Sequence, residues 1–340
     1  MGRVPATLSA TLTALVLGAC TTDAPSASPG AVDSPTAGSP TASDSSFAAP
    51  TQSASPTPSA SPTPSPAPST DVSSGPPEVQ AGAAMADVRT LAGRIGPRLA
   101  TSPAYRRAAR LVGTRLSDLG YDVRRETFRV PAGDSWGVPV AAGRSSNVVA
   151  EPAGFDPAEP HVVVGAHLDT VAVAPGAEDN ASGVAVLLEV ARLAARDGTR
   201  LPVVVIAFGA EEPRGPGDDL HHFGSQHHVR EMPGRRRGAL RAMVSLDRVG
   251  VGTVVPVCTG PLSPPQVRRA LLRAAARVDV PARPCENVAS DHWSFEKAGV
   301  VVARLGSTSY PAYHSAEDLP RVVDPAQLGR TGRVVWEWLR

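Results

Sequence analysis

Mostly apolar runs recur along this chain and alternate with segments whose apolar residues have helical spacing. The runs lie at residues 161–167, 203–208, 242–246 and 300–305. An apolar run without polar alternation is typical of a strand covered on both faces. The spacing of apolar residues predicts helices over residues 83–95, 103–119, 184–195, 265–278, 290–298 and 325–339. The pattern therefore predicts a single large α/β domain with a buried sheet.

Residues 121–130 follow a different pattern, in which charged and apolar side chains alternate. This alternation is typical of an edge strand or of a strand with one exposed face. Shorter strands are predicted over residues 147–150 and 254–257. Residues 213–222 are polar and punctuated by Gly and Pro, which predicts an exposed loop.

The composition changes sharply before this domain. Residues 21–77 are almost entirely Ala, Ser, Thr and Pro, and Asp is their only charged residue type. Such a segment cannot bury enough apolar surface to offset the entropy lost on ordering. We expect a disordered tether over residues 21–80 and a folded domain over residues 81–340. The net charge of +1 gives no electrostatic reason to expect a nucleic acid partner.

The first twenty residues have the features of an export signal. Arg3 gives a positive end, residues 6–18 give a short apolar core, and small residues precede Cys20. The segment 17–20 resembles the cleavage box of bacterial lipoproteins, which implies a lipid on Cys20 and a membrane anchor on the extracytoplasmic face. The alternative is an ordinary secretory peptide with an incidental cysteine.

Metal-type ligands follow the predicted buried strands. In open parallel sheets, the carboxyl ends of the strands form the ligand crevice. The residues at these ends and in the adjoining loops are His167, Asp169, Asp179, Glu211, Glu212, Asp247 and His314. Each has a simpler interpretation by itself: a hydrogen-bonded loop histidine, a helix cap, or a solvated acidic turn. Together, two histidines and three carboxylates suit a pair of zinc ions, with one glutamate left to carry protons.

Other histidines and cysteines are assigned no catalytic or metal-binding role. His221, His222, His227 and His228 are predicted to be solvated, because they lie in an irregular polar stretch. Cys258 and Cys285 have no metal-ligand spacing. An exported compartment permits a disulfide between them, and two free buried thiols are the alternative.

The order and spacing of seven short motifs resemble the M28 family of zinc metallopeptidases. These motifs are Gly165–Asp169, Asp179–Gly183, Glu211–Glu212, Gly224–Ser225, Leu246–Asp247, Ser290–His292 and Tyr313–His314. The resemblance implies a three-layer phosphorylase/hydrolase-like fold with a mixed, mostly parallel central sheet flanked by helices.

The resemblance also implies a role for each site residue. His167, Asp179 and Asp247 would bind one Zn²⁺. Asp179, Glu212 and His314 would bind the other, so that Asp179 bridges the two ions. Asp169 would orient His167, and Glu211 would be the general base. Tyr313 would stabilise the oxyanion.

We therefore expect a monomeric, extracytoplasmic dizinc aminopeptidase that acts on peptides. One alternative is a glutaminyl cyclase-like acyltransferase with one zinc, and another is an inactive peptide-binding lipoprotein. Glutaminyl cyclase-like relatives have Trp before the last histidine, whereas this chain has Tyr313. Two departures from the family affect specificity: the segment Pro213–Phe223 is long, and Arg248 stands where many relatives have Met.

Overall fold

The computed structural model describes residues 78–340. The expected signal peptide, the lipid on Cys20 and the tether up to residue 77 lie outside the described residues. Val79 is already buried against the domain, and the N–H of Gln80 donates to Glu189. Within residues 78–340, no helix has both the length and the apolar character needed to cross a membrane.

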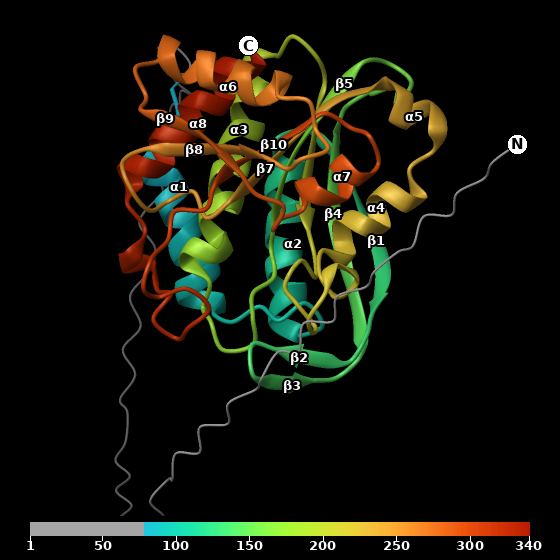
Figure 1. The fold of residues 1–340 in the computed structure, drawn as a ribbon, viewed down its shortest axis with the longest axis vertical. Coiled ribbons are helices and arrows are strands. Elements are labelled where there is room, and N and C mark those ends of the chain that lie inside the picture. Colours follow the sequence, from blue (N-terminus) through green and yellow to red (C-terminus); the bar gives the residue numbers. More distant parts are fainter. Residues whose placement is uncertain (1–77) are drawn as a thin grey trace, which may run out of the picture. The chain divides into compact units, whose positions relative to one another are not determined.

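The domain is built on an eight-stranded mixed sheet (Figure 1). Its strands, in spatial order, are β1 (Tyr121–Val130), β4 (Gly143–Pro152), β6 (Val203–Phe208), β5 (His161–His167), β7 (Leu240–Asp247), β10 (Val302–Gly306), β8 (Val255–Thr259) and β9 (Ala282–Glu286). The four central strands β6, β5, β7 and β10 are parallel to one another. The predicted α/β class with a mixed, mostly parallel sheet is confirmed, and β1 is an edge strand as expected.

Helices cover both faces of this sheet (Figure 1). One layer contains α1 (Ala81–Val88), continued by a π-helix over Arg89–Ile95, with α2 (Pro103–Asp118), α3 (Gly183–Asp197), α6 (Gln266–Arg277) and α8 (Pro325–Leu339). The other layer contains α4 (Phe223–Glu231), α5 (Gly234–Ala239) and α7 (His292–Lys297). Successive residues of β5 confirm the arrangement, because Val162 and Val164 pack in one core and Val163 packs in the other.

Five strands and helices were not predicted from the pattern. The hairpin of β2 (Gly133–Ser135) and β3 (Val138–Val140) is too short to show periodicity. Strand β9 is mostly exposed and contains Pro284, so it lacks the apolar run of a buried strand. Helices α4 and α5 are short and carry several basic and histidine residues.

Cys258 of β8 and Cys285 of β9 face each other in the parallel pair and form a disulfide. The sequence left this pairing open, and the structure decides in favour of the bond. It joins the two outermost strands at one side of the sheet.

The register of the central strands places their carboxyl ends at one edge. His167 at the end of β5 is level with Phe208 of β6, and Asp247 of β7 is level with Gly306 of β10. The helix α3 begins close to this edge at Gly183. A Cβ atom built on Gly183 would lie 2.3 Å from the carbonyl oxygen of Leu246, so a side chain there would force the helix away from β7.

Candidate metal centre

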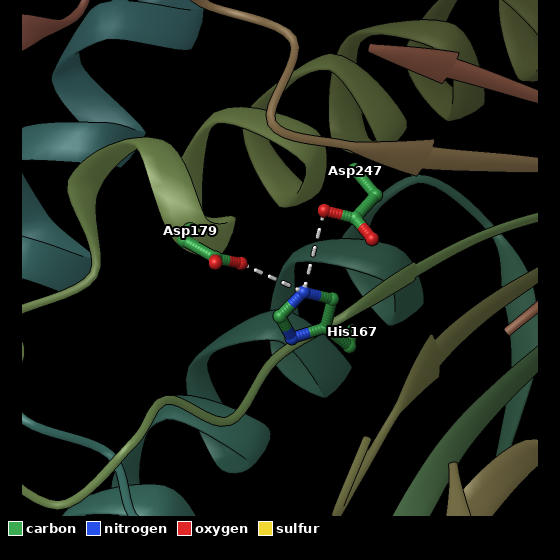
Figure 2. Close-up of side chains that lie close together, drawn as sticks. All are labelled: His167, Asp179 and Asp247. Carbon is green, nitrogen blue, oxygen red and sulfur yellow. Dashed lines mark ion pairs between the residues drawn. The ribbon is translucent and has the colours of Figure 1, made fainter. Parts of the chain in front are cut away.

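Three of the predicted ligands form one compact group at the carboxyl edge of the sheet (Figure 2). His167 ends β5, Asp247 ends β7, and Asp179 lies in the turn before α3. The Nε2 atom of His167 is 3.1 Å from Oδ1 of Asp179 and 3.7 Å from Oδ1 of Asp247. All three residues are buried. Their ligand atoms are close enough to one another to share one metal ion.

A second group lies beside the first and shares one residue with it. The Nε2 atom of His314 is 3.2 Å from Oδ2 of Asp179 and 3.2 Å from Oε2 of Glu212. Asp179 therefore directs one carboxylate oxygen at each histidine. This is the geometry needed for a carboxylate that bridges two ions.

The donor set fits a pair of zinc ions. Imidazole nitrogens and carboxylate oxygens are normal zinc ligands, and catalytic zinc sites keep an open position. Oε1 of Glu212 is buried and has no hydrogen-bond partner among the described residues. A buried carboxylate oxygen without a partner is costly, and a cation beside it removes that cost.

Asp169 fixes the two glutamates rather than orienting His167 through its carboxylate. Its Oδ1 accepts from the N–H of Glu211 at 3.0 Å, and its Oδ2 accepts from the N–H of Glu212 at 3.2 Å. The Nδ1 atom of His167 lies 3.2 Å from the main-chain carbonyl of Asp169, whereas the nearest carboxylate oxygen is 3.9 Å away. The Nδ1–H therefore donates to that carbonyl, which leaves Nε2 free as a ligand atom.

Asp179 is held by a buried carboxylate that the sequence analysis missed. Asp318 accepts from the N–H groups of Glu178 and Asp179 at 2.9 and 3.1 Å, and it also accepts from the hydroxyl of Tyr310 at 3.1 Å. The carboxylate of Glu178 accepts in turn from the N–H of Gly250 at 2.9 Å. Asp318 and Glu178 resemble any other loop carboxylates in the sequence, so nothing in the pattern identified them.

Asp247 has a buried cationic partner that was also missed. Arg304 lies within β10 and is fully buried. Its Nη2 is 3.0 Å from Oδ2 of Asp247. The other oxygen of Asp247 remains directed at His167. In the sequence, Arg304 interrupts an apolar run, and a charge inside a buried strand is the signal that could have found it.

His314 lies in a tight turn lined by aromatic residues. Its φ is 54°, and its ring stacks on Tyr313 with centroids 3.7 Å apart. Trp136, at the turn of the β2–β3 hairpin, meets His314 edge-on at 4.3 Å. Trp136 and Tyr313 are both partly exposed to solvent. They form a rim beside the second group of ligands.

The expectation that all four neighbouring histidines are solvated is wrong for two of them. His222 is buried, and its Nε2 is 3.2 Å from Oε1 of Glu211. His228 is also buried, with its Nδ1 2.8 Å from Oε2 of Glu126. The loop 213–222 is exposed only at its tip, residues 216–219. Its last residue turns back into the site because the main-chain N–H groups of His222 and Phe223 pair with the carbonyls of Glu211 and Ala210.

Burial and crowding shift the pKa values of the cluster. Burial, and then the negative charge of Asp179, raise the pKa of Glu212 to about 8. Burial opposes protonation of His314, but Glu212 and Asp179 outweigh it and raise the His314 pKa to about 10. Burial also opposes ionisation of Asp179, but contacts with His167 and His314 hold its pKa below the usual value. Without a metal ion, the positive charge of the protonated histidines balances the negative charge of the carboxylates.

Asp291 and His292, the last two residues of the motif Ser290–His292, are both fully buried. Burial, and then the charge of Glu211, raise the Asp291 pKa to about 7. Neither oxygen of Asp291 has a hydrogen-bond partner within residues 78–340. Burial, and then Arg304, lower the His292 pKa to about 3.

A comparison with protein-family models matches residues 147–339 to peptidase family M28. The chain belongs to peptidase family M28. The matched region contains all five candidate ligands and Glu211.

Individual relatives match over shorter stretches. The chain is 34% identical over 122 residues to the uncharacterized protein YfbL of Escherichia coli, covering 33% of this chain and 35% of YfbL. It is 29% identical over 185 residues to aminopeptidase YwaD of Bacillus subtilis, covering 51% of this chain and 39% of YwaD. The chain thus matches little more than a third of the length of either relative.

The fold is similar to that of BSAP, a zinc aminopeptidase from Bacillus subtilis. The TM-score is 0.69, and the alignment covers 78% of this chain and 95% of BSAP. Sequence identity over this alignment is 19%. The superposition therefore shows a common fold.

Proposed function

We propose that this protein is a dizinc aminopeptidase, which hydrolyses the N-terminal peptide bond of peptides. The observation that carries the proposal is the carboxylate of Asp179, whose two oxygens face two different histidine-containing groups. Membership of peptidase family M28 and the likeness to aminopeptidase YwaD support the same activity.

The residues present would hold two zinc ions. His167, Asp179 and Asp247 would bind one, and Asp179, Glu212 and His314 the other. When bound, a zinc pair supplies a Lewis acid for the peptide carbonyl and makes water nucleophilic at neutral pH. The remaining chemistry belongs to the protein's own side chains.

Glu211 is the residue placed to carry the proton. It is buried beside the ligands, its N–H is fixed by Asp169, and its carboxylate contacts His222. In the reaction, Glu211 takes a proton from the attacking water as the C–O bond forms. It then gives that proton to the leaving amine as the C–N bond breaks. Tyr313, at the rim beside His314, is the candidate donor to the oxygen that gains charge.

Substitution of Glu211 tests this mechanism. Glu211→Gln keeps the shape of the side chain but removes the base, so kcat should fall by at least about 10³-fold while zinc content stays at two per chain. The measurements are release of N-terminal residues from a peptide panel and metal analysis of the same samples. Unchanged turnover in Glu211→Gln would remove this residue from the mechanism.

We also propose that the enzyme works outside the cytoplasmic membrane, attached through a lipid on Cys20. The support is the segment Leu17–Cys20 and the Ser/Pro-rich stretch that follows it. Two acyl chains give stable membrane attachment where one gives marginal binding. The full-length chain should take up labelled palmitate and sediment with membranes, and Cys20→Ser should do neither. Unlabelled protein in the soluble fraction would favour an ordinary secretory signal.

A further inference from the structure

Arg248 lines the same pocket as the five candidate ligands. It follows Asp247 directly, and its φ of 56° turns the chain at the end of β7. Its N–H donates to Oδ1 of Asn180 at 3.1 Å, and its carbonyl accepts from the N–H of Ser307 at 3.2 Å. The backbone is therefore fixed on both sides of a side chain that faces the site.

The guanidinium of Arg248 has no hydrogen bond to any other described residue. Its nearest ionic neighbour is Asp247, with Nε 3.7 Å from Oδ1, which is too long for a hydrogen bond. Its Cζ lies 4.5 Å from the centre of the Tyr313 ring. Only 15% of the side chain is exposed to solvent. A nearly buried group with five N–H donors thus keeps them free for another molecule.

Two other buried arginines donate hydrogen bonds to the main chain, although Nε and Nη2 of Arg304 have no hydrogen-bond partner within residues 78–340. Arg98 donates to main-chain carbonyls, including those of Leu168 at 3.0 Å and Gly176 at 2.9 Å. Arg304 donates to the carbonyl of Ala289 at 2.7 Å and pairs with Asp247. Arg248 has no equivalent partners within residues 78–340, although it is the arginine placed at the pocket rim beside Tyr313.

Asp247 cannot be the intended partner of Arg248. One oxygen of Asp247 pairs with Arg304, and the other faces His167 in the ligand group. A planar guanidinium pairs best with a carboxylate through two parallel hydrogen bonds. The contact with the Tyr313 ring restricts the orientation of that plane. No carboxylate oxygen of the described residues lies within hydrogen-bond distance of the Arg248 guanidinium, which leaves this place open to the carboxylate of a bound molecule.

We propose that Arg248 binds a carboxylate of the substrate. The carboxylate belongs either to the side chain of an acidic N-terminal residue or to the C-terminus of a dipeptide. This inference rests on the proposed function, which places the scissile bond at the candidate ligands. Arg248 and the candidate ligands line one pocket of about 100 Å³, so a carboxylate next to that bond can reach Arg248.

Binding to an inactive enzyme separates the two sources of carboxylate. The zinc-loaded Glu211→Gln protein is titrated calorimetrically with matched pairs of ligands. Glu-Leu-amide and Gln-Leu-amide differ only in the charge of the N-terminal side chain, whereas Ala-Leu and Ala-Leu-amide differ only at the C-terminus. We expect the charged member of one pair to bind at least tenfold more tightly than its neutral partner, and the pair that discriminates identifies the source.

Variants of Arg248 show whether this residue causes the discrimination. In the Glu211→Gln background, Arg248→Met should bring the affinity ratio close to one, and Arg248→Gln serves as a second variant if the first unfolds. Arg235→Met is the matched control, because Arg235 is exposed on α5 and should leave the ratio unchanged. Equal affinities within both pairs, or a ratio that persists without Arg248, would overturn the proposal.

The proposed hydrolysis and the proposed subsite can fail separately. If the Glu211-containing enzyme cleaves neutral peptides but shows no Arg248-dependent preference, the function stands and the subsite is wrong. If an Arg248-dependent preference is measured but no peptide is cleaved, the subsite stands and the aminopeptidase activity is wrong.

Discussion

The imidazole of His222 lies against the proposed general base, with Nε2 3.2 Å from Oε1 of Glu211. No other cationic nitrogen of the described residues lies within 4.0 Å of this carboxylate. His222 lies near the end of the long segment Pro213–Phe223, which follows the paired glutamates. This segment therefore supplies a partner for the proposed general base. The other ring nitrogen, Nδ1, is 4.0 Å from Asp218, which is itself paired with Lys297.

We expect His222 to position Glu211 for proton transfer. Replacing it by Gln should lower kcat about tenfold and change KM by less than about twofold, because the contact is with the base and not with the substrate. Burial opposes ionisation of Glu211, and His167 and then His222 lower its pKa. Loss of His222 should therefore move the acid limb of the kcat profile to higher pH. Steady-state kinetics from below pH 4.5 up to about pH 9 measures both effects, because the pKa of Glu211 is lowered from 4.5.

His227→Gln is the control for this variant, because His227 is half-buried on α4 and contacts Arg230. Its kinetics and zinc content should equal those of the unmodified enzyme. An unchanged kcat in His222→Gln would show that Asp169 and the candidate metal ligands suffice to place Glu211.

Asp318 is expected to hold the carboxylate of Asp179 in place. In Asp318→Asn, the amide can accept from only one of the two N–H groups of Glu178 and Asp179, and its own NH₂ faces the other. We expect a loss of stability of about 1–3 kcal/mol and zinc affinity at least about tenfold weaker. Urea unfolding of the metal-free domain and competitive zinc titration measure the two effects.

Tyr310→Phe separates the backbone contacts of Asp318 from its contact with the phenol. It removes only the hydroxyl donor to Asp318 and keeps both N–H contacts. Its zinc affinity should fall less than that of Asp318→Asn. Equal losses in both variants would mean that the Tyr310 hydroxyl, and not the main-chain contacts, positions the Asp179 turn.

The sequence predicted the central strands well because their signal is strong. Each central strand is covered on both faces, so it appears in the sequence as an apolar run. The candidate ligands were found because they lie at the ends of these runs or in the loops next to them. Helix α8 was also predicted with its observed bounds, because Pro325 starts it and its apolar spacing is regular. Short elements such as β2 and β3 have too few residues to show any period.

The supporting residues of the site were not predictable in the same way. Asp318 and Glu178 act through contacts between segments far apart in the chain, and their neighbours in sequence give no sign of those contacts. Arg304 also acts across segments, and its only signal in the sequence is a charge inside an apolar run. His222 was misinterpreted for a related reason. Its surroundings are polar, yet the return of the loop to Ala210 and Glu211 buries it.

The disulfide should contribute stability without contributing to catalysis. Cys258 and Cys285 are separated by 27 positions, and a crosslink of that span is worth about 3 kcal/mol. We expect Cys258→Ser with Cys285→Ser to lower the urea midpoint and to keep kcat/KM within about twofold. The unmodified protein treated with a reductant should match the double variant in stability. Equal stability of oxidised and reduced protein would show that the bond is energetically neutral.

Zinc binding should release protons and strengthen as the pH rises. The raised pKa values of Glu212, about 8, and His314, about 10, mean that both ligands hold protons at pH 7 in the metal-free site. A metal ion requires the unprotonated forms, so its binding must expel these protons. Calorimetric titration in buffers of different ionisation enthalpy should show proton release at pH 7 and less release at pH 9. Zinc affinity that does not change between pH 6 and 9 would contradict this view of the cluster.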